Sequence, residues 1–252
     1  MKAERPCSDL IPQLRSLWKE AFGDTDAFLD LFFGLAYDPD RCRCIRSQGR
    51  VTAALYWLDM YCGDEKNAYI YAVATAGDCR GQGLCRQLMT DTAAVLKEKD
   101  YCGALLVPQD EGLRAMYSRM GYRNTAAIDE CFCAAGDTAL SVQEIPSKEY
   151  AARRAGYLPQ KSVHPSDAAL AFLAALARFY AGDGFAAAVS RESGHLRILE
   201  YLGDGRHLPG LIAALGATEA TVRMPGNTVP FAMYLPLSPN CTEPSYYPFA
   251  FD

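Results

Sequence analysis

The seven residues from Arg80 to Arg86 combine two glycines with two arginines, a combination that suits the binding of an anion. The segment reads Arg-Gly-Gln-Gly-Leu-Cys-Arg, and apolar residues at helical spacing follow it. Glycines at a helix N-terminus leave several backbone N–H groups facing outward with no Cβ in the way. Those amides and the positive end of the helix dipole favour a phosphate, which an arginine can grip through two hydrogen bonds. The segment therefore predicts a phosphate-binding turn.

A plain strand-to-helix turn is the alternative interpretation of the same residues. Two familiar nucleotide-binding patterns do not fit. No Lys-Ser or Lys-Thr follows Gly83, so the turn is not a P-loop, and Arg86 stands where G-x-G-x-x-G has its third glycine. A phosphate turn of another kind is thus the functional hypothesis.

A strand and a helix must position this turn. Residues 69–75 are rich in β-branched and aromatic side chains and predict a strand, which the sequence Ala-Gly-Asp at 76–78 ends. The helix is expected from about Gly81 to Lys99, with apolar residues at Leu84, Leu88, Val95 and Leu96.

Two motifs in this region resemble those of one enzyme family. The family pattern Q/R-x-x-G-x-G/A is matched by Arg80, Gly83 and Cys85, with cysteine in place of the last small residue. Downstream, 105–107 reads as a strand, and 113–122 (Leu-Arg-Ala-Met-Tyr-Ser-Arg-Met-Gly-Tyr) is similar to the segment F/L-Y-x-x-x-G-F/Y. Together they resemble the GNAT superfamily of acetyl-CoA-dependent N-acetyltransferases, over about the first half of the chain.

The resemblance implies a site and a reaction. It implies an enzyme, an acyltransferase that moves an acetyl group from acetyl-CoA directly to a primary amine of a small molecule or peptide. Tyr117 is implied as the general acid, because a phenol stays protonated at neutral pH and can protonate a leaving thiolate. The residues implied to bind the co-substrate are Val73, Thr75, Arg80, Gly81, Gln82, Gly83, Leu84, Cys85 and Arg86.

The general base is left open by the sequence. Asp110, Glu111 and Glu130 are expected near the cleft, where surface solvation explains most carboxylates. A resemblance to the enhanced-intracellular-survival family of N-acetyltransferases, in which the chain terminus reaches the active site and serves as the base, implies the C-terminal carboxylate of Asp252 as a further candidate. The chain end Phe-Ala-Phe-Asp is apolar enough to dock in this way. A packed or frayed terminus is the competing interpretation of that end.

Strands that alternate with helices predict an α/β layered fold, and the resemblance makes it the GNAT fold, a mixed central sheet flanked by helices. Two helices are expected before Pro39, then strands at 41–46 and 51–62, a turn at 63–67, and later a strand at 122–133. The pattern restarts after residue 135. We therefore expect domain 1–135 to be a GNAT acetyltransferase domain and domain 136–252 to be a degenerate GNAT-like domain.

The second half has its own expected elements. Strands are expected at 138–145, 185–190, 195–202, 218–224 and 231–237, and helices at 147–155, from 166 with apolar residues as far as Tyr180, and at 208–215. Its glycine turn, 203–207, lacks the R-x-x-G-x-G/A pattern, and Asp204 would repel phosphate. A tandem of this kind resembles the enhanced-intracellular-survival family of N-acetyltransferases. That family usually carries a further sterol-carrier-like domain at its C-terminus, which we do not expect within these 252 residues.

Composition narrows the possible partners. The net charge is −5 over 252 residues, which argues against nucleic acid as a partner. No run of 18 apolar residues predicts a membrane span, and the first ten residues lack the apolar core of a signal peptide, so a cytoplasmic protein is expected. The acceptor is expected to be an amine. The sequence leaves the oligomeric state open, with a homo-oligomer as one alternative.

Ten cysteines raise the question of a metal or redox protein. The pairs Cys42/Cys44 and Cys131/Cys133 would share a strand face, but zinc sites usually have wider spacings. Buried reduced thiols and no metal are the preferred interpretation. A non-catalytic acyl-CoA-binding regulator on the same fold is the main alternative to the enzyme.

Overall fold

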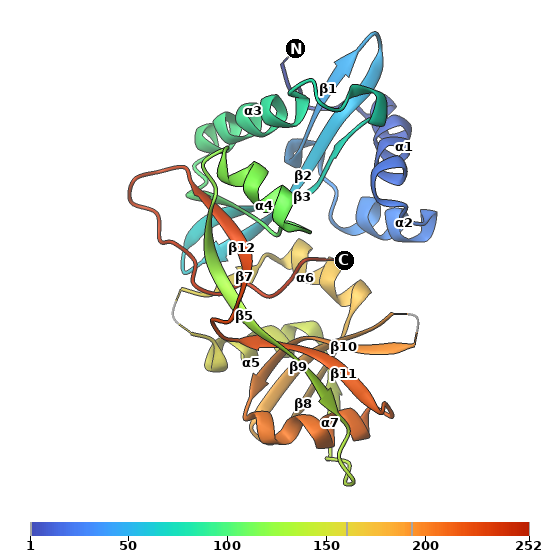
Figure 1. The fold of residues 1–252 in the computed structure, drawn as a ribbon, viewed down its shortest axis with the longest axis vertical. Helices are drawn as coiled ribbons and strands as arrows, with labels where there is room; N and C mark the ends of the chain where they lie inside the picture. The colour runs from blue at the N-terminus through green and yellow to red at the C-terminus, as the bar shows by residue number, and fades with distance from the viewer. Residues whose placement is uncertain (1, 160, 193, 252) are drawn as a thin grey trace. The chain divides into compact units, whose positions relative to one another are not determined.

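The computed structural model of the protein describes residues 2–159, 161–192 and 194–251. The chain forms two compact units, which are interleaved in sequence. Unit 1 contains 1–123, 164–172 and 234–242, and unit 2 contains the rest of the chain. Figure 1 labels the helices and strands of both units.

Unit 1 is built on a sheet with helices on its faces. Its helices and strands are α1 (Ile11–Phe22), α2 (Asp26–Leu35), β1 (Cys42–Ser47), β2 (Arg50–Cys62), β3 (Glu65–Thr75), α3 (Leu84–Glu98), β4 (Gly103–Leu106) and α4 (Glu111–Ser118). The short strand β7 (Val163–Pro165) pairs with β2, and the end of β12 (Val229–Pro236) lies beside β4. Figure 1 shows α1 and α2 on one side of β2 and β3, and α3 on the other.

Local residue chemistry sets the helix ends. Gly23 ends α1 in the left-handed conformation, with φ of 76°. Thr25 caps α2 by accepting a hydrogen bond from the backbone N–H of Phe28 at 3.2 Å. Asp110 caps α4 in the same way, through the N–H of Leu113 at 2.7 Å. The two N-terminal helices predicted from the sequence are thus confirmed.

The strands of unit 1 pair in a fixed order. β1 pairs with β2 and β2 with β3, both antiparallel, and β3 pairs with β4 in parallel. The parallel contact is short, because only 67–69 of β3 pair with 103–105 of β4. An aromatic cluster that contains Trp18, Phe32 and Tyr56 packs α1 and α2 onto this sheet.

Unit 2 repeats the same order of elements. Its helices and strands are β5 (Arg123–Ala134), β6 (Gln143–Ile145), α5 (Ser147–Tyr157), α6 (Asp167–Leu176), β8 (Arg178–Gly182), β9 (Phe185–Glu192), β10 (His195–Gly203), α7 (Leu208–Ala214), β11 (Glu219–Pro225) and the start of β12; the first residues of α6 belong to unit 1. β8, β9 and β10 are antiparallel, and β10 pairs with β11 in parallel. The run β8-β9-β10-α7-β11 therefore has the topology of β1-β2-β3-α3-β4, as the α/β tandem expectation requires.

Four sequence predictions of local structure need correction. The strand expected at 138–145 covers only Gln143–Ile145, because Gly136 and Leu140 bond to backbone carbonyls at the start of α7 instead. The helix expected to continue to Tyr180 ends at Leu176, since pairing with β9 makes 178–182 a strand. Glu65–Asn67 begin β3 rather than a turn, and α3 begins at Leu84 rather than Gly81.

No helix in the described part of the chain is both long and apolar enough to cross a membrane.

Candidate functional site

A cavity of about 530 Å³ lies in unit 1, between the end of β3, the loop before α3, and α4. This volume is within the usual range of small-molecule sites. The residues that line it are Ala21, Phe22, Val73, Ala74, Thr75, Cys79, Arg80, Gly81, Gly83, Leu84, Cys85, Arg86, Leu113, Met116, Tyr117, Arg119 and Met120. Of the co-substrate residues implied by the sequence, the cavity brings together all except Gln82, whose side chain bonds instead to the carbonyl of Asp78 at 3.4 Å.

A bulge interrupts β3 where the strand reaches the cavity. Ala54 of β2 faces Ala74, whereas Tyr56 faces Tyr71, so two residues of β3 stand opposite one residue of β2. Ala72 adopts a φ of 49°, which is unusual for a residue other than glycine. The bulge bends the strand away from its regular course just before Val73.

The backbone beyond the bulge turns two N–H groups away from β2. The N–H of Ala76 donates to the carbonyl of Thr52 in β2, at 2.9 Å. Since alternate residues of a strand direct their backbone groups to opposite edges, the N–H groups of Val73 and Thr75 face the other edge. β4 pairs only with residues 67–69, and both Val73 and Thr75 line the cavity. These amides can therefore donate to a bound carbonyl.

The loop before α3 has the conformation that only its glycines adopt easily. Gly81 and Gly83 have φ of 74° and 79°, and a Cβ on either would meet nothing within 4 Å. Gly83 is the N-cap of α3 and supplies no side-chain bond to it. Because the first helical bond runs from Gln87 N–H to the Gly83 carbonyl, the N–H groups of the first turn remain for a ligand.

Three arginines surround the cavity. Arg80 and Arg86 were expected there, and both are exposed at the loop. Arg119, just after α4, also lines the cavity and was missed, although it stands two residues after Tyr117 in the tyrosine motif. Among the described residues that line the cavity, none is Asp, Glu or His. The site is therefore electropositive within an acidic protein.

Tyr117 lies on the cavity side of α4 and is almost fully buried. Burial, with a smaller contribution from the nearby Cys85, raises the pKa of its phenol well above the ordinary value. Its ring contacts that of Tyr122 edge-on, with centroids 5.8 Å apart. A phenol held in this way stays protonated through the neutral range, which is the state that a proton donor needs.

The three internal carboxylates considered as bases have structural partners. Asp110 caps α4, Glu111 pairs with Arg114 at 3.2 Å, and Glu130 pairs with Arg223 at 2.8 Å. None of the three lines the cavity. Asp252 lies outside the described residues, so its role stays a prediction.

The cysteines form no cluster of metal ligands within the described ranges. Cys42 and Cys44 are buried in β1, and burial raises the pKa of both thiols. In β5, Cys131 is exposed and Cys133 is half-buried.

In unit 2 the corresponding glycine turn, 203–207, is filled by the side chain of Asp204. Asp204 accepts a hydrogen bond from the Arg206 N–H at 2.9 Å and forms an ion pair with the Arg206 guanidinium at 2.6 Å. A carboxylate thus takes the place where an anionic ligand would bind.

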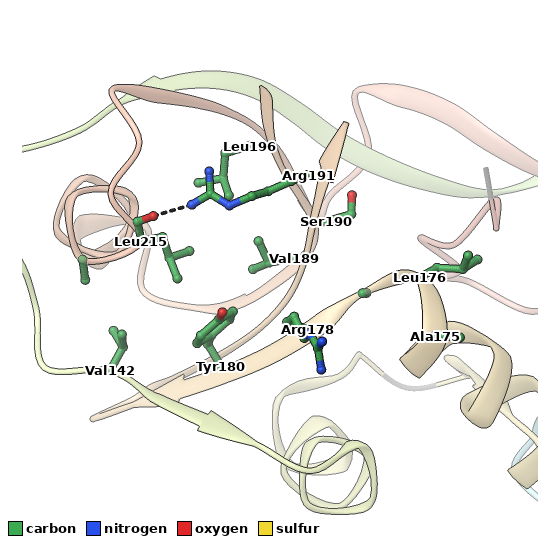
Figure 2. Close-up of a pocket in the computed structure, with 12 residues that line it drawn as sticks. Val142, Ala175, Leu176, Arg178, Tyr180, Val189, Ser190, Arg191, Leu196 and Leu215 are labelled. Atoms are coloured by element: carbon green, nitrogen blue, oxygen red, sulfur yellow. Dashed lines mark hydrogen bonds between the residues drawn. The ribbon is translucent and has the colours of Figure 1, made fainter. Parts of the chain in front are cut away.

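Unit 2 has a cavity of about 390 Å³ at the opposite end of α7. Figure 2 shows Val142, Val189 and Leu196 around it, with Arg191 donating a hydrogen bond to the Leu215 carbonyl. No glycine lines this cavity among the described residues, so it differs in kind from the cavity of unit 1.

Comparison with known proteins points to the family that the sequence motifs resemble. Residues 5–125 match the model of a family described as an acetyltransferase (GNAT) domain. No curated protein matches the chain.

Similar solved structures cover nearly the whole chain. A GCN5-related N-acetyltransferase from Kribbella flavida superposes with a TM-score of 0.70 at 14% identity, over 92% of this chain and 70% of that one. Eis1 from Mycobacterium abscessus superposes with a TM-score of 0.66 at 11% identity, over 94% of this chain and 74% of that one. A tandem GNAT protein from the clavulanic acid biosynthesis pathway superposes with a TM-score of 0.58 at 13% identity, over 95% of this chain and 100% of that one. Residues 5–125 are thus similar to an acetyltransferase domain of the GNAT family, and the chain as a whole shares the fold of these solved structures.

Proposed function

We propose that the protein transfers the acetyl group of acetyl-CoA directly to a primary amine of a small molecule or peptide. The observation that carries this proposal is the joining, around one cavity, of the bulged end of β3, the glycine loop and Tyr117. Each supplies one requirement of the reaction: donors for the thioester oxygen, a cradle for the diphosphate, and a proton for the leaving thiolate.

The loop would hold the diphosphate of coenzyme A. The first-turn N–H groups of α3 supply aligned donors, and the helix dipole adds partial positive charge. Arg80, Arg86 and Arg119 supply full charges around the same cavity. Arginine grips phosphate oxygens through two parallel bonds, which fixes the orientation of the co-substrate as well as its affinity.

The edge of β3 would hold the acyl end. The N–H groups of Val73 and Thr75 face away from β2 and can donate to the pantetheine arm and to the thioester oxygen. As the amine attacks, negative charge develops on that oxygen, and a fixed donor stabilises it more than it stabilises the ground state.

Tyr117 would protonate the leaving thiolate. Collapse of the tetrahedral intermediate breaks the carbon–sulfur bond and leaves the electron pair on sulfur. Although burial raises the pKa of Tyr117, a thiolate formed in the same apolar surroundings is also disfavoured as an anion, so proton transfer between the two stays feasible.

The amine must reach the thioester unprotonated. An alkylamine with a pKa of about 10.4 loses its proton at neutral pH at a cost of about 4–5 kcal/mol. The described lining of the cavity holds no carboxylate or histidine, so the carboxylate of Asp252 is our proposed base.

The deciding experiment measures turnover and binding together. The protein is incubated with acetyl-CoA and a panel of amines, and coenzyme A is followed by chromatography, because the ten cysteines would react with thiol reagents. Tyr117→Phe should lower kcat by about 10²- to 10⁴-fold with little change in acetyl-CoA affinity. Tyr122→Phe, at the neighbouring buried ring, is the matched control and should retain most of the activity. Binding without turnover in the parent would favour a regulator instead.

A further inference from the structure

Three cysteines of unit 1 gather at a place that the acyltransfer site does not use. Cys62 ends β2, Cys102 directly precedes β4, and Cys241 follows β12. The Sγ atom of Cys241 contacts the carbonyl oxygen of Cys102, and the two thiols also interact with each other. None of the three lines the acyltransfer cavity. Two residues far apart in sequence thus lie in direct contact, with the Cys241 thiol against the backbone of Cys102.

The backbone fixes both thiols in this position. The Cys102 N–H donates to the carbonyl of Lys66, and its carbonyl accepts from the Leu237 N–H, each at 2.8 Å. Next to Cys241, the N–H and hydroxyl of Thr242 donate to the carboxylate of Glu65 at 2.7 and 3.1 Å. The two chain segments are therefore already docked, and a covalent bond between them needs little further ordering.

Access separates the pair from the third cysteine. Cys102 and Cys241 are half-buried, whereas Cys62 is only 3% exposed. A small oxidant can thus reach the first two thiols more readily than the third.

We propose that Cys102 and Cys241 are a site of oxidative modification, and that a low-molecular-weight disulfide converts them to an intramolecular disulfide. One thiolate attacks the oxidant, forming a mixed disulfide and releasing one small thiolate. The second cysteine thiolate then attacks the protein sulfur of that mixed disulfide and releases the other small thiolate. Two protein thiols lose two electrons and two protons, and one oxidant disulfide is reduced to two thiols. The product staples residues 234–242, which include the end of β12, to the start of β4.

The rate of crosslinking between Cys102 and Cys241 should depend on pH, because the reaction requires a deprotonated thiol. Burial, followed by the neighbouring Cys241, raises the pKa of Cys102 to about 11. Because the thiolate is the nucleophile, the rate of crosslinking should rise with pH up to that range. Cys62 and Glu65 face this thiol from the packed segments, and both shift its pKa in the same upward direction. The buried phenol of Tyr234, from β12, also faces the two thiols.

The test uses the full-length protein and oxidised glutathione. Reduced protein is incubated with oxidised glutathione, remaining thiols are blocked with N-ethylmaleimide, and a non-reduced digest is examined by mass spectrometry. We expect a peptide pair joined through Cys102 and Cys241, and an intact mass lower by two hydrogen atoms before blocking. A link that uses Cys62, or no intramolecular link, overturns the proposal.

Matched variants identify the partners and the effect. Cys102→Ser and Cys241→Ser should each abolish the crosslink, whereas Cys133→Ser, at another half-buried cysteine, should leave it unchanged. Oxidation should raise the unfolding midpoint of the parent and not that of Cys241→Ser, because a disulfide constrains the unfolded chain. An equal midpoint before and after crosslinking contradicts the stapling. If a serine variant fails to fold, the peptide map of the parent still decides.

Discussion

The side chain of Arg80 holds the end of β3, because its Nε atom donates a hydrogen bond to the carbonyl oxygen of Thr75 at 3.2 Å. This bond links the glycine loop to the strand edge, the two parts of the site that would hold the diphosphate and the acyl end. A guanidinium has five N–H donors, so the same group can also bind phosphate oxygens.

Arg80→Lys separates charge from geometry. Lysine keeps the positive charge but cannot donate to Thr75 and to a phosphate from one planar group. We expect acetyl-CoA affinity to fall by about 10- to 100-fold, the usual scale for hydrogen bonds to charged groups. Isothermal titration calorimetry measures this directly. Arg206→Lys, in the glycine turn of unit 2, is the control and should bind like the parent. Unchanged affinity in Arg80→Lys would show that charge alone suffices.

Gly83→Ala tests the backbone of the loop. The residue has a φ of 79° in open space, so alanine meets no clash but suffers the left-handed strain of about 1–2 kcal/mol. Its Cβ would also stand where the phosphate is expected. Stability should fall modestly, and acetyl-CoA binding should fall at least tenfold.

Gly216→Ala is the control for Gly83→Ala, because it introduces the same backbone strain at a position far from the site in sequence. Gly216 has a φ of 68°, also in open space, and lies after α7 in unit 2. Urea unfolding should show a similar loss of stability in the two variants, and only Gly83→Ala should lose affinity. Equal loss of affinity in both would mean that strain, and not the site, is responsible.

The sequence was enough to predict the glycine loop and the helices beside it because their signals are local, whereas Tyr117 was singled out by the resemblance of 113–122 to a family motif. Glycines with positive φ, a capping Asp110 and periodic apolar residues act within a few positions, and the structure places the elements close to where they were predicted. Helix α1 and its end at Gly23 were found for the same reason.

The parts that the sequence could not give depend on distant pairing. The helical spacing continues through Ala177 to Tyr180, but hydrogen bonds to β9 make 178–182 a strand. The bulge at Ala72 depends on the register with β2, which no local pattern encodes. Arg119 joins the site only because α4 packs beside the loop, and the interleaving of the two units depends on pairing between segments far apart in sequence.

The buried ion pair of unit 2 predicts a large stability effect. Arg154 and Glu200 are 1% and 0% exposed, with Nε and Oε2 2.7 Å apart, and Tyr150 donates to the same carboxylate. Glu200→Gln leaves a buried arginine without its counter-charge, which should cost about 3–5 kcal/mol of unfolding free energy. Glu149→Gln, which breaks the exposed pair with Arg153, should cost about 0–1 kcal/mol. Urea denaturation compares them, and equal losses would contradict the assignment.

Buried tyrosines predict a loss of stability at high pH. Burial raises the pKa of Tyr56, Tyr117, Tyr122 and Tyr150 above 10 in the folded state. Above pH 10 the unfolded chain releases protons that the folded chain keeps, so their contribution to stability is complete below that pH and is lost as pH rises. Each of these tyrosines should lower the free energy of unfolding by about 1 kcal/mol per pH unit above pH 10. Urea unfolding at pH 8 and pH 11 measures the difference, and a flat profile would argue against it.

Gly103 is needed because Tyr234 occupies the space of its missing side chain. A Cβ at Gly103 would lie 2.1 Å from the Cζ and Oη atoms of Tyr234, whose hydroxyl donates to the Asn67 side chain at 3.1 Å. Tyr234 is fully buried, so the ring cannot move aside without disturbing its packing in unit 1. Gly103→Ala should therefore destabilise the protein by about 1–3 kcal/mol or more, as overpacking does.

A second change separates this clash from a general intolerance of alanine. Tyr234→Leu removes the ring, so the double variant with Gly103→Ala should lose less stability than the sum of the single changes. Gly156→Ala, in α5 with nothing within 4 Å of its Cβ, should raise stability by about 0.5–1 kcal/mol through helix propensity. Additive losses in the double variant would show that the two residues do not compete for the same space, and that β4 fails to accept a side chain at this position for another reason.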